Sequence, residues 1–148
     1  MNARIVCLGN RYTAADDLGP RVYDWLAARA LPPNVAVVDG GLGGLDLAPL
    51  VERSRRVVFV DTVVGLAAPG EVLVLDAAAL ARHAAGEVGY GHGGGLAYLL
   101  RALPIVCASP PPCALVGAAA PASQGLVARV AARALGLAES PEEGAVTA

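Results

Sequence analysis

The stretch RIVCLGNRYTAADDLGPRV, residues 4–22, decides the fold. Its first five residues are a short apolar run that ends at a Gly-Asn pair, which is typical of a buried strand. Two adjacent acids follow, Asp16 and Asp17, and then a Gly-Pro pair leads into apolar residues at helical spacing. This stretch therefore predicts a strand, a loop that carries two acids, and a helix.

The same alternation continues along the chain. Because the expected strands are apolar along their whole length and are separated by helices, the sequence predicts a three-layer α/β/α sandwich with a mostly parallel sheet. One domain is expected over residues 1–148, with a loose acidic tail from about 138 to 148. The strands are predicted over residues 4–8, 35–38, 57–60, 72–75 and 115–117, and later helices over 45–54 and around 96–103 and 127–134.

Composition narrows the classes of function. Apolar residues make up 55% of the 148 residues and aromatic residues 4%, so the core is expected to consist of small, branched side chains. All eleven basic residues are scattered arginines and the net charge is −2, which excludes nucleic acid as an expected partner. The chain lacks the basic and apolar segments of a secretory signal and any apolar run near the roughly 18 residues of a membrane span. A cytoplasmic protein is therefore predicted, while its oligomeric state is left open.

The two acids of the first loop have two interpretations. Asp is a favoured residue at a helix N-cap, so either acid could cap the helix that follows. Pro20, however, is best suited to the first helical position, which would make Gly19 the cap and leave both acids upstream of the helix. In that case Asp16 and Asp17 are available to hold a ligand.

Three further residues are candidates for a site. Asp39 and Asp61 each end a predicted strand, where an Asp either closes a turn or faces the crevice beyond the carboxyl ends of the strands, in which ligands of such sheets bind. His92 lies among glycines, either in a plain surface loop or where the backbone can bring its imidazole into a site. Two carboxylates and one imidazole suit Ni²⁺, Zn²⁺ or a related ion.

Other glycine-rich motifs fit less well. The GHGGG segment at residues 91–95 is similar to the oxyanion loop of lipases, but no serine lies in a G-x-S-x-G elbow. The first strand is not followed by G-x-G-x-x-G, and no GK[ST] is present, so dinucleotide and P-loop sites are not indicated. A metal site remains.

Four motifs together resemble the endopeptidases that mature nickel–iron hydrogenases. They are LGNRYTAADDLGPRV (8–22), VVDGGLGGLDL (37–47), FVDTVVGLAAPGEVLVL (59–75) and GHGGGLAYLLRAL (91–103), and the resemblance covers roughly residues 3–120. It implies removal of a C-terminal extension from the hydrogenase large-subunit precursor after nickel has been loaded.

The resemblance also implies a site. The family's metal-contacting positions carry over to Asp16, Asp61 and His92, and Asp16 is identified by its spacing of six residues from Asn10 and three from Gly19. These three are the predicted catalytic and metal-contacting residues, with Asp39 as a possible accessory. The nickel is expected to arrive with the precursor, and Zn²⁺ or Cd²⁺ could take its place in the site.

The chain also departs from the family pattern. Ala15 stands where the family usually has its first acid, and the Glu-Pro-containing segment common in the family is missing after residue 117. Two alternatives therefore stay open at this point: a catalytically idle metal-binding assembly protein of the same fold, and a related peptidase, similar to the germination proteases, with another substrate.

Overall fold

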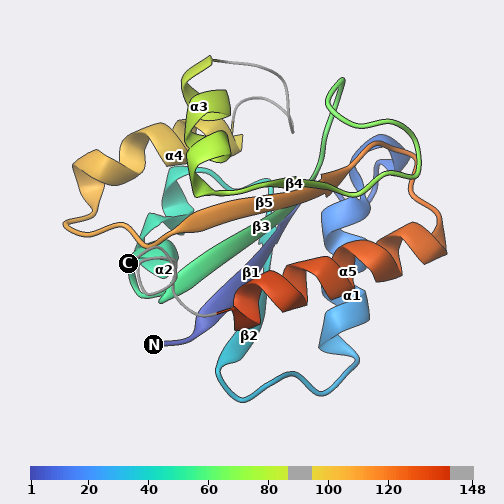
Figure 1. Ribbon diagram of the computed structural model, residues 1–148, viewed down its shortest axis with the longest axis horizontal. Helices are drawn as coiled ribbons and strands as arrows, with labels where there is room; N and C mark the ends of the chain where they lie inside the picture. Colours follow the sequence, from blue (N-terminus) through green and yellow to red (C-terminus); the bar gives the residue numbers. More distant parts are fainter. Residues whose placement is uncertain (87–94, 141–148) are drawn as a thin grey trace.

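A five-stranded, mostly parallel sheet forms the centre of the molecule in the computed structural model, which describes residues 1–86 and 95–140 (Figure 1). The strand order is β2-β1-β3-β5-β4. Four strands run parallel, and the short edge strand β4 runs antiparallel to β5. The sheet is thus mostly parallel, as the sequence predicted. The strands are β1 (Ala3–Leu8), β2 (Val35–Gly41), β3 (Arg56–Thr62), β4 (Leu73–Leu75) and β5 (Cys113–Ala118).

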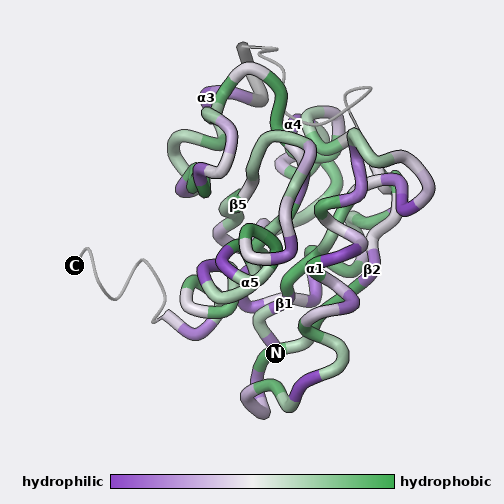
Figure 2. The backbone as a smooth tube through the Cα atoms, turned by 90° about the vertical axis from the view of Figure 1, so that its right-hand side faces the viewer, coloured by the Kyte–Doolittle hydropathy of each residue, from purple (hydrophilic) through white to green (hydrophobic). Residues whose placement is uncertain are grey.

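Helices cover both faces of this sheet. On one face lie α1 (Leu18–Ala27) and α5 (Gln124–Glu139), and on the other lie α2 (Ala48–Glu52), α3 (Ala77–Gly86) and α4 (Gly95–Val106) (Figure 1). Hydrophilic and hydrophobic residues alternate along α1 and α5 in Figure 2, as expected of helices with only one face on a sheet. The three-layer α/β/α prediction is thus confirmed.

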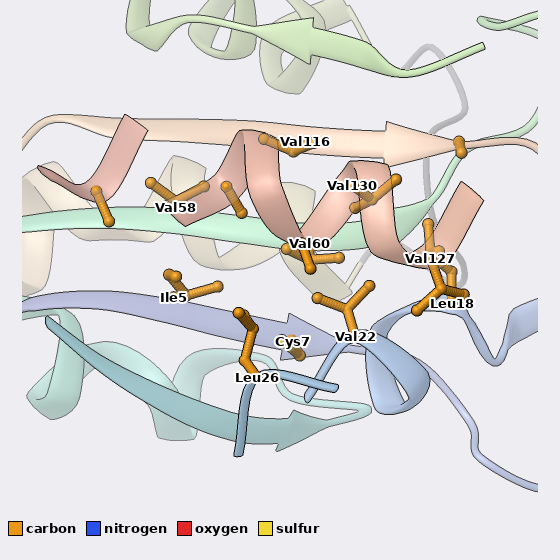
Figure 3. Close-up of a cluster of buried hydrophobic side chains, with 14 of the residues drawn as sticks. Ile5, Cys7, Leu18, Val22, Leu26, Val58, Val60, Val116, Val127 and Val130 are labelled. Atoms are coloured by element: carbon orange, nitrogen blue, oxygen red, sulfur yellow. The ribbon is translucent and has the colours of Figure 1, made fainter. Parts of the chain in front are cut away.

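The core explains why the strands are apolar throughout. Successive side chains of a strand point to opposite faces, so Ile5 and Cys7 pack in one layer while Val6 and Leu8 pack in the other. Every residue of β3 is buried because it lies between β1 and β5. In the layer shown in Figure 3, strand side chains meet those of α1 and α5: Ile5, Cys7, Val58, Val60 and Val116 against Leu18, Val22, Leu26, Val127 and Val130.

The start of α1 differs from the expectation. The helix begins at Leu18 with Asp17 at the N-cap position, although the Asp17 side chain makes no capping hydrogen bond. Of the two interpretations, the one with Gly19 as the cap and Pro20 at the first position was therefore wrong. The N–H of Arg21 donates to the carbonyl of Asp17 (3.1 Å), which makes Pro20 the third helical residue. Proline fits there because the N–H groups of the first turn have no partner within the helix.

Several elements also have different bounds. β2 and β3 continue through Asp39 and Asp61, which were expected to follow their strands. The predicted helix over 45–54 is a 3₁₀ turn, η2 (Leu45–Leu47), followed by α2. Within residues 1–86 and 95–140, none of the helices is long and apolar enough to cross a membrane.

Candidate functional site

The first loop folds back on itself and holds Asp16 in a buried position. Asp16 ends a 3₁₀ turn, η1 (Ala14–Asp16), and is only 4% exposed. The N–H of Asn10 lies within hydrogen-bonding distance of both the Asp16 carbonyl (2.9 Å) and its Oδ2 (3.1 Å), and the N–H of Asp16 donates to the Thr13 carbonyl (2.8 Å). Gly9 makes this fold possible, because it has a φ of +138° and a Cβ there would overlap the Asp16 carbonyl.

Asp61 comes from the centre of the sheet. It is the sixth residue of β3, 6% exposed, and its Oδ1 accepts a hydrogen bond from the N–H of Thr62 (2.8 Å). Burial, and after it the negative charge of Asp16, raise the pKa of Asp61 to about 8, against the smaller opposing effect of the Thr62 N–H. The carboxylate of Asp16 is thus close enough to influence the ionisation of Asp61.

Asp16 and Asp61 line one small cavity at the carboxyl edge of the sheet. Its volume is about 30 Å³, which is enough for an ion or a water molecule. The lining residues are Leu8, Gly9, Asp16, Gly41, Leu42, Gly43, Asp61 and Leu96. β1, β2, β3 and the start of α4 therefore meet at this point, beyond the carboxyl ends of parallel strands, where ligands of α/β sheets bind.

The other predicted site residues lie differently. Asp39 is exposed, accepts from the N–H of Gly41 (3.3 Å), and pairs with Arg11 (3.6 Å), so the structure does not bring it into the cavity. Asp17 lies beside Arg21 at the start of α1, 3.8 Å between side-chain atoms. His92 lies outside the described residues, and its convergence with the two acids stays a prediction.

Sequence reasoning missed two features of the site. The end of β2 and the loop after it contribute Gly41, Leu42 and Gly43 to the cavity wall, and the signal for this was the glycine run around a single leucine in DGGLGG. Arg11 fastens the first loop to its surroundings by bonding to Asp24 (2.9 Å) in addition to its contact with β2. An isolated arginine in a loop carries no such signal, because its partners come from distant segments.

The chemistry open to this pair is limited and specific. Two buried carboxylates that line one cavity can bind a divalent cation through oxygen. Within residues 1–86 and 95–140, no group of three or more Asp, Glu, His or Cys is placed so that it could hold a metal ion, and the described part of the cavity offers two acidic ligands. Any other ligand of a bound ion must be a group other than these two acids.

Fold and site together define the class: a three-layer α/β protein with a buried carboxylate pair at the carboxyl edge of a parallel sheet. The family model described as HycI, hydrogenase maturation protease, matches residues 20–124. The chain therefore belongs to the hydrogenase maturation protease family, in agreement with the sequence resemblance. No curated protein sequence matches it.

Solved structures share this fold. The hydrogenase maturating endopeptidase HybD from Escherichia coli superposes with a TM-score of 0.70 at 25% identity, over 93% of this chain and 89% of that chain. The maturation protease HycI from Thermococcus kodakarensis KOD1 superposes with a TM-score of 0.68 at 21% identity, over 93% of this chain and 90% of that chain. The hydrogenase 2 maturation peptidase from a Thaumarchaeota archaeon superposes with a TM-score of 0.56 at 25% identity, over 93% of this chain and 95% of that chain.

Proposed function

We propose that this protein is an endopeptidase that removes a C-terminal extension from the nickel-loaded large-subunit precursor of a nickel–iron hydrogenase. The observation that carries the proposal is the pair of buried carboxylates, Asp16 and Asp61, in one small cavity at the carboxyl edge of the sheet. Membership of the maturation protease family supplies the reaction class, peptide hydrolysis.

The carboxylate pair fits a divalent cation. Two acids with side chains almost fully withdrawn from water repel each other when both are ionised, and this repulsion contributes to the raised pKa of Asp61. A cation in the cavity would remove the repulsion and draw both carboxylates into their ionised form. The nickel that the precursor carries is such a cation, and Zn²⁺ or Cd²⁺ can serve as its probe in vitro.

In this proposal the protease recognises the ion as part of its substrate. Asp16 is held rigidly by the N–H of Asn10 and Asp61 by the N–H of Thr62, so both can meet an incoming ion without rearrangement of the strands. His92 is proposed as the third contact. A bound nickel would supply Lewis acidity toward the scissile carbonyl, and the chain's own part is to bind the ion and so place the peptide bond over the cavity.

The test compares nickel-loaded and nickel-free precursor as substrates. Purified protein is incubated with each form, with and without a chelator, and shortening of the precursor is followed by mass spectrometry. We expect cleavage of the loaded precursor only, and loss of cleavage in Asp61→Asn but not in the matched variant Asp17→Asn, whose carboxylate lies beside Arg21. Efficient cleavage of nickel-free precursor would refute recognition through the ion.

A further inference from the structure

An exposed apolar side chain stands at the rim of the acid-lined cavity. Leu42 lines the cavity, yet 72% of the residue is exposed to solvent. Leu45, three residues later, is 39% exposed. Burying this exposed leucine against an apolar group of a bound chain would be favourable, and its place on the cavity wall puts it where such a chain would lie.

The loop that carries Leu42 is firmly built. The N–H of Gly43 donates to the Gly40 carbonyl (3.0 Å), and the N–H of Gly9 donates to the Gly41 carbonyl (2.8 Å), which ties this loop to the first one. The side chain of Leu47 fills the space where a Cβ of Gly43 would lie. Leu42 is therefore presented at a fixed place beside Asp16 and Asp61.

The size of the cavity determines what can lie against Leu42. A volume of about 30 Å³ accommodates an ion but not a length of polypeptide, so the residues that flank a peptide bond at the two acids must lie along the rim. Apart from the two acids, the described residues that line the cavity are glycines and leucines. The backbone at Gly41 also leaves room for a neighbouring chain, because a Cβ built there meets nothing within 4 Å.

We propose that Leu42 is a specificity-determining residue that contacts an apolar side chain of the substrate directly next to the scissile bond. The occupant of this rim is thus the polypeptide being cut, with an apolar residue immediately before or after the cleaved bond. This inference rests on the proposed function, because that function places a scissile peptide over the cavity. The contact selects among precursors by covering Leu42 from water.

The test combines variants of the protease with variants of the precursor. Leu42→Ser should lower kcat/KM for nickel-loaded precursor about tenfold, mainly by raising KM, since a hydrophobic contact of this size gives roughly that discrimination. Leu42→Met should retain most of the activity. The matched control is Ile105→Ser, because Ile105 is 85% exposed and lies nine residues, about 14 Å, further along α4 than the cavity-lining Leu96.

Two precursor variants complete the cycle, with Ser in place of the residue before or after the cut. With the wild-type protease, one of these precursor variants should have a kcat/KM about tenfold lower than the unchanged precursor. With Leu42→Ser the same precursor variant should lower kcat/KM little further, because both changes remove the same contact. Additive losses with both precursor variants, or a Leu42→Ser enzyme as active as Ile105→Ser, would overturn the inference. Failure of the wild-type protein to cut loaded precursor would refute the proposed function itself, and the inference with it.

Discussion

Replacing Asp61 by Asn should change how the stability of the protein depends on pH. Asn keeps the shape of the side chain and its acceptor for the Thr62 N–H, but it cannot ionise. The wild-type carboxyl is buried near Asp16 and has a pKa of about 8, compared with its ordinary 3.8. The substitution therefore removes a buried group whose ionisation opposes folding.

The sign and the size follow from proton linkage. Between about pH 4 and pH 8 the folded state keeps the proton of Asp61 while the unfolded state has lost it, so the free energy of unfolding falls as pH rises. The slope is about 1.4 kcal/mol per pH unit for one proton. Between pH 5 and pH 7 this group should therefore lower the free energy of unfolding of the wild-type protein by about 3 kcal/mol. Asp61→Asn lacks the group and should not show this decrease.

Urea unfolding followed by circular dichroism at pH 5 and pH 7 measures this difference. The difference in free energy of unfolding between Asp61→Asn and the wild type should shift by about 3 kcal/mol in favour of Asp61→Asn from pH 5 to pH 7. The control Asp17→Asn, which removes a carboxylate beside Arg21 and outside the cavity, should show no comparable gain. In Asp16→Asn, NMR titration should find the pKa of Asp61 lowered but still above its ordinary value, because burial is the larger cause.

Parallel pH profiles for wild type and Asp61→Asn would refute this reasoning. They would mean that the carboxyl of Asp61 ionises alike in the folded and unfolded states. Burial and the neighbouring charge of Asp16 would then not govern this site, and the argument that the pair is arranged for a cation would lose its electrostatic support.

Three further predictions concern the metal site and two glycines. In a calorimetric titration with Ni²⁺ or Cd²⁺, Asp16→Asn should abolish binding while Asp17→Asn retains most of it, and the reverse result would show that the other acid is the ligand. Gly19→Ala should destabilise the protein severely, because its Cβ would overlap the backbone at the end of β1. Gly136→Ala, with open space on α5, should instead raise the free energy of unfolding by about 0.5–1 kcal/mol in urea melts.

Much of the fold can be predicted from the sequence because burial on both faces leaves a local signature. β3 is apolar from Val57 to Val60 since both of its faces are covered, and such a run needs no knowledge of its neighbours to be identified as a strand. The site could be placed in the same way. Carboxyl ends of parallel strands meet at one edge, so the acids that follow the first and third predicted strands were expected together, and Asp16 and Asp61 do line one cavity.

Pairing between distant segments was decided only by the tertiary structure. The order β2-β1-β3-β5-β4 and the antiparallel direction of β4 depend on how the chain returns to the sheet, which local patterns do not encode. The same holds for the acids. Asp39 and Asp61 end similar apolar runs, yet Asp39 lies on an edge strand, exposed and paired with Arg11, whereas Asp61 lies on a central strand and is buried. The sequence by itself determined which carboxylates stand at the carboxyl edge, but the position of each strand in the sheet decided which of them is withdrawn from water and so acquires unusual chemistry.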